Sequence, residues 1–309
     1  MIKIGIIGMN PGNAHIYSWS SIINGCFDES EITIAGYPKV AEYLAANNDT
    51  LGINGARVTH VWTQDKAISE SVARSSQIGN IVGSLEEMAI AIDAVILARD
   101  DAENHLSMSK PFIDAGIPIF IDKPLATTEK DMAWFTGQHD KGKVFMSCSS
   151  MRYSNECRTA KADMKSLGEI QLVTAVGKKD WLKYGVHLLE AIFTLLDDPH
   201  PVSVQHIGEK NKDIVHVIFE NGIYATLHLF MDISSTFQLS IFGENGWRLV
   251  DIKNSYAMFR DTIIEFVRSV EDGNSRLPFY KTQNIIQTLI GANTSRKGGG
   301  TIIQLKNWL

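Results

Sequence analysis

The sequence predicts an α/β protein in two parts, a doubly wound parallel sheet followed by an α+β domain with a large, mostly antiparallel open sheet. Up to about residue 148, short apolar runs alternate with segments of helical periodicity, which is typical of β-α units. Beyond residue 149, strand-like segments follow one another across tight turn signals. The 309 residues suit about two domains, which we place at 1–148 and 149–309.

The first part contains β-α units in regular succession. We expect a helix ending at Gly116, because glycine readily adopts the left-handed C-cap conformation. Ile32–Ala35 could be a further strand, but the β-α units that begin at Arg57 favour reading residues 25–56 as an insertion. The expected elements are strands at 2–7, 57–63, 92–98, 117–121 and 143–147 and helices at 13–23, 65–76, 102–115 and 128–141.

The second part changes to successive strands. Glu220-Asn221-Gly222 and the segment 243–246 supply tight turns. Two helices, at 257–270 and 282–293, close the domain, and the glycines of 296–300 indicate a flexible turn before a last strand, with a phosphate-cradling role as the alternative. The expected strands are 170–176, 202–207, 214–219, 223–231, 236–242 and 247–251.

Composition narrows the class of protein. The net charge of -6 and the absence of a basic block interleaved with aromatics argue against a nucleic-acid partner. No apolar run approaches the roughly 20 residues that a membrane span needs, and the N-terminus lacks the layout of a signal peptide. The 3 cysteines have no metal-ligand spacing and their odd number argues against a disulfide framework. We therefore expect a cytoplasmic protein without a metal site.

One buried strand ends abruptly in charged residues. Ile117–Ile121 is continuously apolar, as in a strand buried on both faces, and Asp122, Lys123 and Pro124 follow directly. The carboxyl ends of the strands form the edge where open α/β sheets bind ligands. Lys123, held beside a φ-locked proline, is therefore either a chemical group or a solvated strand end.

The loop after the first strand, "GIIGMNPGNAH", lies where a dinucleotide fold places its glycines. Gly8 is in place, Asn10 and Asn13 occupy the next two glycine positions, and Gly12 comes one position early. Asparagine tolerates positive φ better than most residues, so the pattern fits either a cofactor loop or a plain strand-to-helix turn. The candidate cofactor contacts here are Gly8, Met9, Asn10, Gly12 and Asn13.

The position expected to contact an adenosine ribose is Thr63, at the end of "VTHVWT", with Asp65 two residues later. Thr63 can donate a hydrogen bond to a ribose or a phosphate, whereas Asp65 would repel a 2′-phosphate. Asp65 is alternatively the N-cap of the helix that it precedes, and we favour this reading.

Several segments, in this order, resemble the Gfo/Idh/MocA oxidoreductases, the glucose-fructose oxidoreductase and inositol dehydrogenase family. The signature Glu-Lys-Pro of that family has Asp122 in place of the glutamate, and Lys123 and Pro124 intact. The segments are "GIIGMNPGNAH", "SLEEMAIAIDAVILAR", "NHLSMSKPFIDAGIPIFIDKPLA", "MRYSNECRTAKADMKSLGEI" and "YGVHLLEAIFTLL".

The resemblance implies a Rossmann domain that binds NAD or NADP, hydride transfer to or from a sugar, polyol or cyclitol, and a homodimer or homotetramer. Lys123 would lie between the nicotinamide and the substrate oxygen, where its charge would stabilise developing negative charge. His187 matches the catalytic histidine and would exchange the substrate proton. Glu190, one turn later, could orient its ring, but we favour a structural helix contact for it. A capping role is the alternative for the two aspartates of the loop before His105. The other candidate cofactor residues are Ala98, Arg99, Asp100, His105 and Asp122.

One position departs from the family. Many members carry an aspartate four residues before the histidine, and this chain has Lys183. Three roles are open to Lys183: it binds an acidic substrate, it acts in proton transfer itself, or it marks a protein that has lost the alcohol chemistry. The last possibility keeps a non-catalytic ligand-binding or regulatory protein on the same scaffold as the competing hypothesis.

Overall fold

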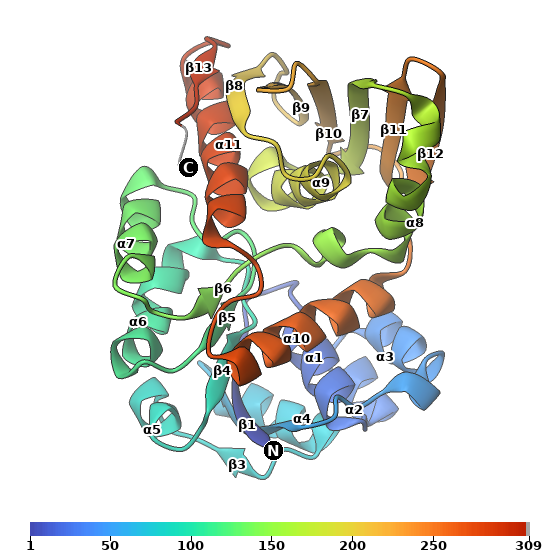
Figure 1. Ribbon diagram of the computed structural model, residues 1–309. Coiled ribbons are helices and arrows are strands. Elements are labelled where there is room, and N and C mark those ends of the chain that lie inside the picture. Colours follow the sequence, from blue (N-terminus) through green and yellow to red (C-terminus); the bar gives the residue numbers. More distant parts are fainter. Residues whose placement is uncertain (307–309) are drawn as a thin grey trace. The chain divides into compact units, whose positions relative to one another are not determined.

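The computed structural model describes residues 1–306, which form two compact units (Figure 1). Neither unit is one continuous stretch of chain. The first unit comprises Met1–Leu125, Ala133–Ser147 and Phe259–Leu277, and the second comprises Ala126–Met132, Cys148–Met258 and the described part of the chain from Pro278.

The first unit contains a six-stranded parallel sheet in the order β3-β2-β1-β4-β5-β6. This arrangement confirms the predicted doubly wound sheet, whose strand order reverses between β1 and β4. Helices α1 and α4 pack against each other, as do α5 and α6. The strands are β1 (Ile2–Gly8), β2 (Ala56–Thr63), β3 (Asn80–Ile81), β4 (Ala94–Leu97), β5 (Ile119–Ile121) and β6 (Phe145–Met146). The helices are α1 (His15–Asn24), α4 (Lys66–Ser76), α5 (Leu85–Ala89), α6 (His105–Ala115) and α7 (Glu129–His139), with the 3-10 turn η2 (Ala102–Asn104).

The block between α1 and β2 is helical. It contains α2 (Glu29–Ile34), α3 (Pro38–Ala45) and the 3-10 turn η1 (Asn48–Thr50). Asp28 caps α2 by accepting a hydrogen bond from the Glu31 amide, and Ile32 is the buried residue of that helix. The strand alternative for Ile32–Ala35 is therefore wrong, and the strand paired with β1 on this side is β2.

Helix α10 (Ser255–Asp272) returns late in the chain to the first unit. From residue 259 it packs through aromatic side chains: Phe259 lies 5.1 Å from His15 and 6.1 Å from Trp19, and Phe266 lies 5.8 Å from Phe120, measured between ring centroids. Residues from late in the sequence thus pack against α1 and against β5 of the first unit (Figure 1).

The second unit contains a seven-stranded sheet in the order β12-β11-β7-β10-β9-β8-β13. Its pairs are antiparallel except β7 with β10, which run parallel. The connection between these two strands begins with α9 (Trp181–Leu195) and continues through β8 and β9. The predicted, mostly antiparallel sheet is thereby confirmed. The strands are β7 (Ile170–Lys178), β8 (Pro201–His206), β9 (Lys212–Phe219), β10 (Tyr224–Phe230), β11 (Phe237–Gly243), β12 (Gly246–Asp251) and β13 (Ile303–Gln304). The remaining elements are α8 (Asn155–Asp163), α11 (Phe279–Lys297) and the 3-10 turns η3 (Ser150–Tyr153) and η4 (Met164–Leu167).

Helices α9 and α11 pack against this sheet, and we call the face opposite to them the open face. Along the strands, residues of the packed face are buried and alternate with half-buried or exposed residues of the open face. One register row of the open face is apolar across five strands, which we call the apolar row. It consists of Trp247, Phe242, Leu172, Tyr224 and Ile218.

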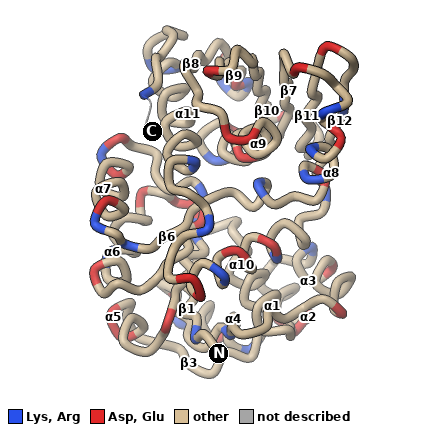
Figure 2. Tube along the Cα trace, viewed as in Figure 1, with Lys and Arg blue, Asp and Glu red and all other residues tan. Residues whose placement is uncertain are grey.

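Acidic and basic residues are interspersed along the chain in both units (Figure 2). Within residues 1–306, no helix combines the length and the apolar character that crossing a membrane requires.

Candidate active site

Lys123 belongs to the first unit and follows β5 at its carboxyl end. The strand pairing with β4 continues for one residue beyond Ile121, because the Asp122 amide donates to the Leu97 carbonyl at 3.0 Å. Lys123 is only 4% exposed and Asp122 only 1%. The alternative of a solvated strand end is therefore wrong, since a buried ammonium needs a specific partner.

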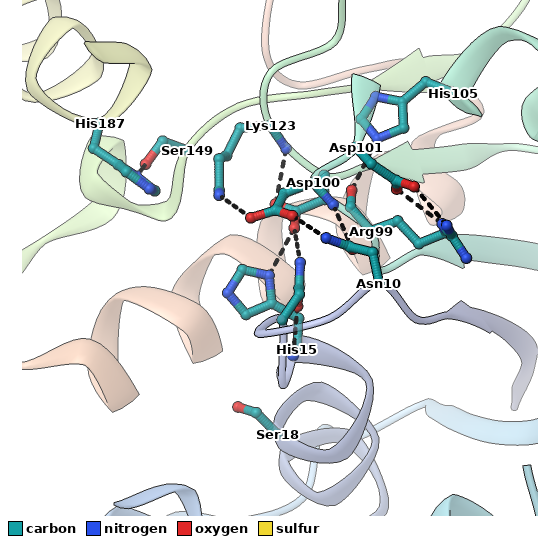
Figure 3. A network of polar contacts seen from close by, with 12 residues as sticks. Asn10, His15, Ser18, Arg99, Asp100, Asp101, His105, Lys123, Ser149 and His187 are labelled. Atoms are coloured by element: carbon teal, nitrogen blue, oxygen red, sulfur yellow. Dashed lines mark hydrogen bonds and ion pairs between the residues drawn. The ribbon is translucent and has the colours of Figure 1, made fainter. Parts of the chain in front are cut away.

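The partner of Lys123 is Asp100, which follows β4 (Figure 3). Lys123 Nζ lies 3.2 Å from Asp100 Oδ2, while Asp100 Oδ1 accepts the Asn10 amide at 2.5 Å. Burial raises the pKa of the Asp100 carboxyl, but Lys123 and Asn10 outweigh it and hold that pKa well below its usual range. Asp100 therefore stays ionised, and its side chain forms an ion pair instead of capping η2.

Asp122 joins the end of β5 to the start of α1. Its Oδ2 lies 2.7 Å from His15 Nδ1 and accepts the Asn13 side-chain amide at 3.2 Å, while Oδ1 accepts the Lys123 amide at 2.8 Å. Burial raises the pKa of Asp122, but His15 and Lys123 outweigh it and lower that pKa. These contacts fix the backbone from which the Lys123 side chain extends.

The loop between β1 and α1 has the backbone that a dinucleotide requires at this position. A Cβ on Gly8 would lie 2.5 Å from Ile16 Cδ1 and 3.1 Å from Ile16 Cβ, so β1 and α1 approach closely where the strand carries a glycine. Gly12 has φ +82°, in the left-handed region, and the space where its Cβ would project is open. A loop of this shape leads the chain into the amino end of α1, where backbone N–H groups favour phosphate. The residues present therefore fit NAD.

The side chains of the two asparagines that replace the glycines face inward. Asn10 is bound to Asp100, and Asn13 to Asp122 and, through Oδ1, to the His15 amide at 2.8 Å. They hold the loop against the ends of β4 and β5, which explains how the loop is ordered without the usual glycines.

Gln64 is a residue of this region that the sequence reasoning missed. It follows β2, accepts the Met9 amide at 3.1 Å and Arg99 Nη1 at 3.0 Å through Oε1, and donates to the Met9 carbonyl. Arg99 also reaches the Met9 carbonyl and pairs with Asp101 at 2.5 Å. The only sequence signal for a role of Gln64 was its position between Thr63 and Asp65.

Thr63, Asp65 and His105 make local contacts. Asp65 caps α4 by accepting the Ala67 amide at 2.8 Å, which confirms the N-cap alternative. The buried Thr63 hydroxyl contacts the Asp65 carbonyl and Ser69. His105 is fully buried, with Nε2 2.8 Å from the Arg99 carbonyl and Nδ1 3.2 Å from the carbonyl of Leu125. His105 therefore ties together the loops after β4 and β5. The Ala98 amide extends the β1 pairing by donating to Ile7 at 2.8 Å.

In the second unit, His187 lies on α9. Asp180 begins that helix by capping it, accepting the Lys183 amide at 3.1 Å, and the side chain of Lys183 is exposed on the first turn. The imidazole is flanked by the rings of Tyr184 and Phe237, whose centroids lie 5.2 and 5.7 Å from its own. His187 Nδ1 lies 2.6 Å from Ser149 Oγ, another contact that sequence reasoning missed (Figure 3).

Below this histidine the second unit contains a buried charge cluster. Glu190 accepts the Ser149 amide at 3.1 Å and Arg152 Nε at 2.6 Å, and Asp198 pairs with Arg152 and Lys281, each at 2.8 Å. Burial lowers the pKa of Arg152, but Glu190 and Asp198 outweigh it and raise that pKa above its usual value. Glu190 thus holds Ser149, the partner of the imidazole.

The parallel sheet and its glycine-bearing loop define a dinucleotide-binding α/β protein. Residues 2–141 match a family model, GFO_IDH_MocA, described as "Oxidoreductase family, NAD-binding Rossmann fold". This match, over less than half of the chain, confirms for these residues the resemblance found in the sequence, and its description names NAD, one of the two cofactors expected. No curated protein matches the chain significantly.

Solved structures of the same fold cover almost the whole chain. The myo-inositol dehydrogenase of Lactobacillus casei, in complex with NAD(H) and myo-inositol, has 16% identity and a TM-score of 0.77 over 99% of this chain and 97% of its own. A putative myo-inositol dehydrogenase of Sinorhizobium meliloti has 14% identity and a TM-score of 0.77, covering 99% and 100%. The scyllo-inositol dehydrogenase of L. casei, with NAD(H) and scyllo-inositol, has 14% identity and a TM-score of 0.75, covering 98% and 99%. At these identities the likeness establishes the fold.

Proposed function

We propose that the protein is an NAD(P)-dependent dehydrogenase that acts on a CH–OH group of a sugar, polyol or cyclitol. The observation that carries the proposal is the buried Lys123 ammonium at the carboxyl end of β5, in a domain of an NAD-binding oxidoreductase family. The inositols bound to the two L. casei enzymes favour a polyhydroxylated ring as substrate.

The chain offers distinct groups for binding and for chemistry. Gly8, Met9 and Gly12 would hold the cofactor through the backbone of the loop before α1. When bound, the cofactor would accept the hydride in its oxidised form or donate it in its reduced form. Lys123 stabilises negative charge that develops on the substrate oxygen, an effect that is strong where water is excluded. His187 exchanges the proton of that oxygen, because imidazole titrates near neutral pH.

Lys183 is assigned to the substrate. Its side chain is exposed one helical turn before His187, so its ammonium can approach a ligand directly. We assign it to an acidic group of the substrate, in place of the aspartate that many family members carry.

Calorimetric titration with NADH and with NADPH tests the proposal. Binding of either is expected, and failure of both to bind at millimolar concentration would overturn it. Cofactor binding without hydride transfer to any polyol or keto sugar would favour the non-catalytic ligand-binding alternative.

A pair of glycine variants gives the titration a matched control. Gly12 and Gly142 both have positive φ and open space beyond the Cβ, but only Gly12 lies in the loop before α1. Gly12→Val should weaken NADH binding at least about tenfold, or about 1.4 kcal/mol, because valine strains the left-handed conformation. Gly142→Val should leave the affinity unchanged, and equal losses in both variants would argue against a cofactor role for the loop.

A further inference from the structure

We propose that Ser149 is a positioning residue for His187, which holds the neutral imidazole in the tautomer that carries its hydrogen on Nε2. The inference rests on the proposed function, because it concerns the residue assigned to proton exchange. It deepens that function by identifying the form of the substrate oxygen that the resting ring recognises.

The tautomer follows from the contacts of one hydroxyl. Ser149 Oγ accepts the Met151 amide at 3.2 Å, and an amide can only donate. The hydroxyl hydrogen then needs an acceptor, and within residues 1–306 the acceptor at hydrogen-bond distance is His187 Nδ1, at 2.6 Å. A ring nitrogen that accepts carries no hydrogen, so in the neutral ring the hydrogen is on Nε2.

The backbone that carries the Ser149 hydroxyl is also held in place. Ser149 is fully buried, and its own amide donates to Glu190 Oε1 at 3.1 Å. Glu190 is in turn held by Arg152. The two terminal nitrogens of Arg152 donate to the Asp198 carboxylate at 2.8 and 3.1 Å. A charge-assisted set of bonds of this kind restricts the backbone that carries the serine, so the ring receives its partner in a fixed place.

A neutral partner has a different effect from a carboxylate. A carboxylate only accepts, and would keep a hydrogen on Nδ1, whereas the serine hydroxyl donates to the neutral ring and turns to accept when the ring is protonated. Nε2 carries a hydrogen in both forms. The ring therefore gives a proton to the substrate oxygen only from its protonated form, and the hydrogen that then remains on Nδ1 is accepted by Ser149 Oγ. The resting ring is therefore a hydrogen-bond donor at Nε2 and suits an oxygen that only accepts, which is a carbonyl oxygen. We infer that the ligand recognised by resting His187 is the carbonyl form of the substrate.

Nitrogen NMR of the histidine rings tests the tautomer without cofactor or substrate. In the full chain labelled with 15N-histidine, the signal assigned by its loss in His187→Asn should show an unprotonated, hydrogen-bonded Nδ1 and a protonated Nε2 in the neutral ring. A hydrogen on Nδ1 would overturn the inference. Ser149→Ala should move the Nδ1 signal, Ser149→Thr should restore it, and Ser150→Ala, which removes the neighbouring hydroxyl, should leave it in place. An Nδ1 signal unchanged in Ser149→Ala would also overturn the inference.

Kinetics test the positioning role separately. Ser149→Ala should lower kcat about tenfold, part of the roughly 10²–10⁴-fold that general acid–base catalysis contributes, and Ser149→Thr should recover most of it with KM for NADH unchanged. A kcat equal to that of the unmodified protein would remove Ser149 from the mechanism. Failure of NADH to bind overturns the proposed function, whereas the NMR result decides on the ring partner whatever the cofactor does.

Discussion

Lys123 and Asp100 form a buried pair whose members depend on each other. Their side chains are 6% and 16% exposed, so neither charge is well solvated alone. A second Lys–Asp pair, Lys110 with Asp114, lies at the surface with both side chains more than half exposed. The two pairs have the same chemistry and differ in burial, which makes the second pair a natural control.

Lys123→Ala should reduce kcat by about 100-fold or more, because it removes the charge that opposes the developing oxyanion. The dissociation constant for NADH should change little, since the proposed cofactor contacts are made by the loop before α1. Steady-state kinetics and calorimetry measure the two quantities. Lys110→Ala should leave both unchanged, and an unaltered kcat in Lys123→Ala would exclude that lysine from the chemistry.

Asp100→Asn should lower the free energy of unfolding at neutral pH by about 3 kcal/mol, because it leaves a buried ammonium without its counterion. The pKa of Asp100 is depressed in the folded protein, so its stabilising contribution is present above the ordinary value of about 3.9 and is lost as pH falls toward the folded value.

The difference between Asp100→Asn and the unmodified protein should therefore shrink below about pH 4 in thermal denaturation. Asp114→Asn, at the surface, should cost less than about 1 kcal/mol at any pH. An Asp100→Asn deficit that stays constant down to pH 2 would contradict the ion-pair explanation.

Single residues were predictable where their partners are close in sequence. Asp65 caps α4 and Gly116 ends α6 in the left-handed conformation, both through contacts within one helical turn. The contacts of Gln64 with Met9 and of Ser149 with His187 join segments 55 and 38 residues apart. No local pattern specifies such pairs, because tertiary packing decides which segments meet.

At the level of elements, the strands of the second unit were predicted within a few residues from their alternation and turns. In the first unit, strand β3 was missed because its two residues are exposed and form no apolar pattern. The parallel pairing of β7 with β10 was also missed, because it depends on where α9 returns the chain and not on either strand's sequence.

Helix α9 contains a glycine that its packing requires. A Cβ on Gly185 would lie 2.7 Å from Trp181 Cε3, and that indole is buried and fixed by its bond to the Leu289 carbonyl. Gly185→Ala should therefore destabilise the protein by about 1–3 kcal/mol through overpacking. Thermal or denaturant unfolding measures the change.

Gly137 in α7 is the matched control, because its Cβ would meet nothing within 4 Å. Gly137→Ala should stabilise the protein by about 0.5–1 kcal/mol, the usual preference for alanine in a helix. A stabilised Gly185→Ala protein would show that the indole can move aside.

For the whole molecule, the apolar row on the open face of the second sheet is the feature that predicts assembly. Trp247 is 65% exposed and Tyr224 54%, and they lie in one row with Phe242. Contiguous apolar surface of this kind marks interaction sites. We expect two copies to pair through this face, giving a homodimer or a homotetramer.

Light scattering on a size-exclusion column measures the assembly. Trp247→Glu should shift the protein toward the monomer, because a charge in the apolar row opposes its burial. Ile90→Glu, at a residue 89% exposed in the first unit, should not change the mass. A monomeric unmodified protein would refute the expected assembly.

The return of α10 to the first unit affects when this unit can fold during synthesis and whether a truncated chain can fold. Phe259 and Phe266 cover Trp19 and Phe120, so the ribosome must have passed residue 266 before the amino-terminal unit can bury its own aromatics. A fragment that stops at residue 148 should emerge with those rings bare and need a chaperone, whereas co-expression with a peptide of residues 255–277 should rescue it.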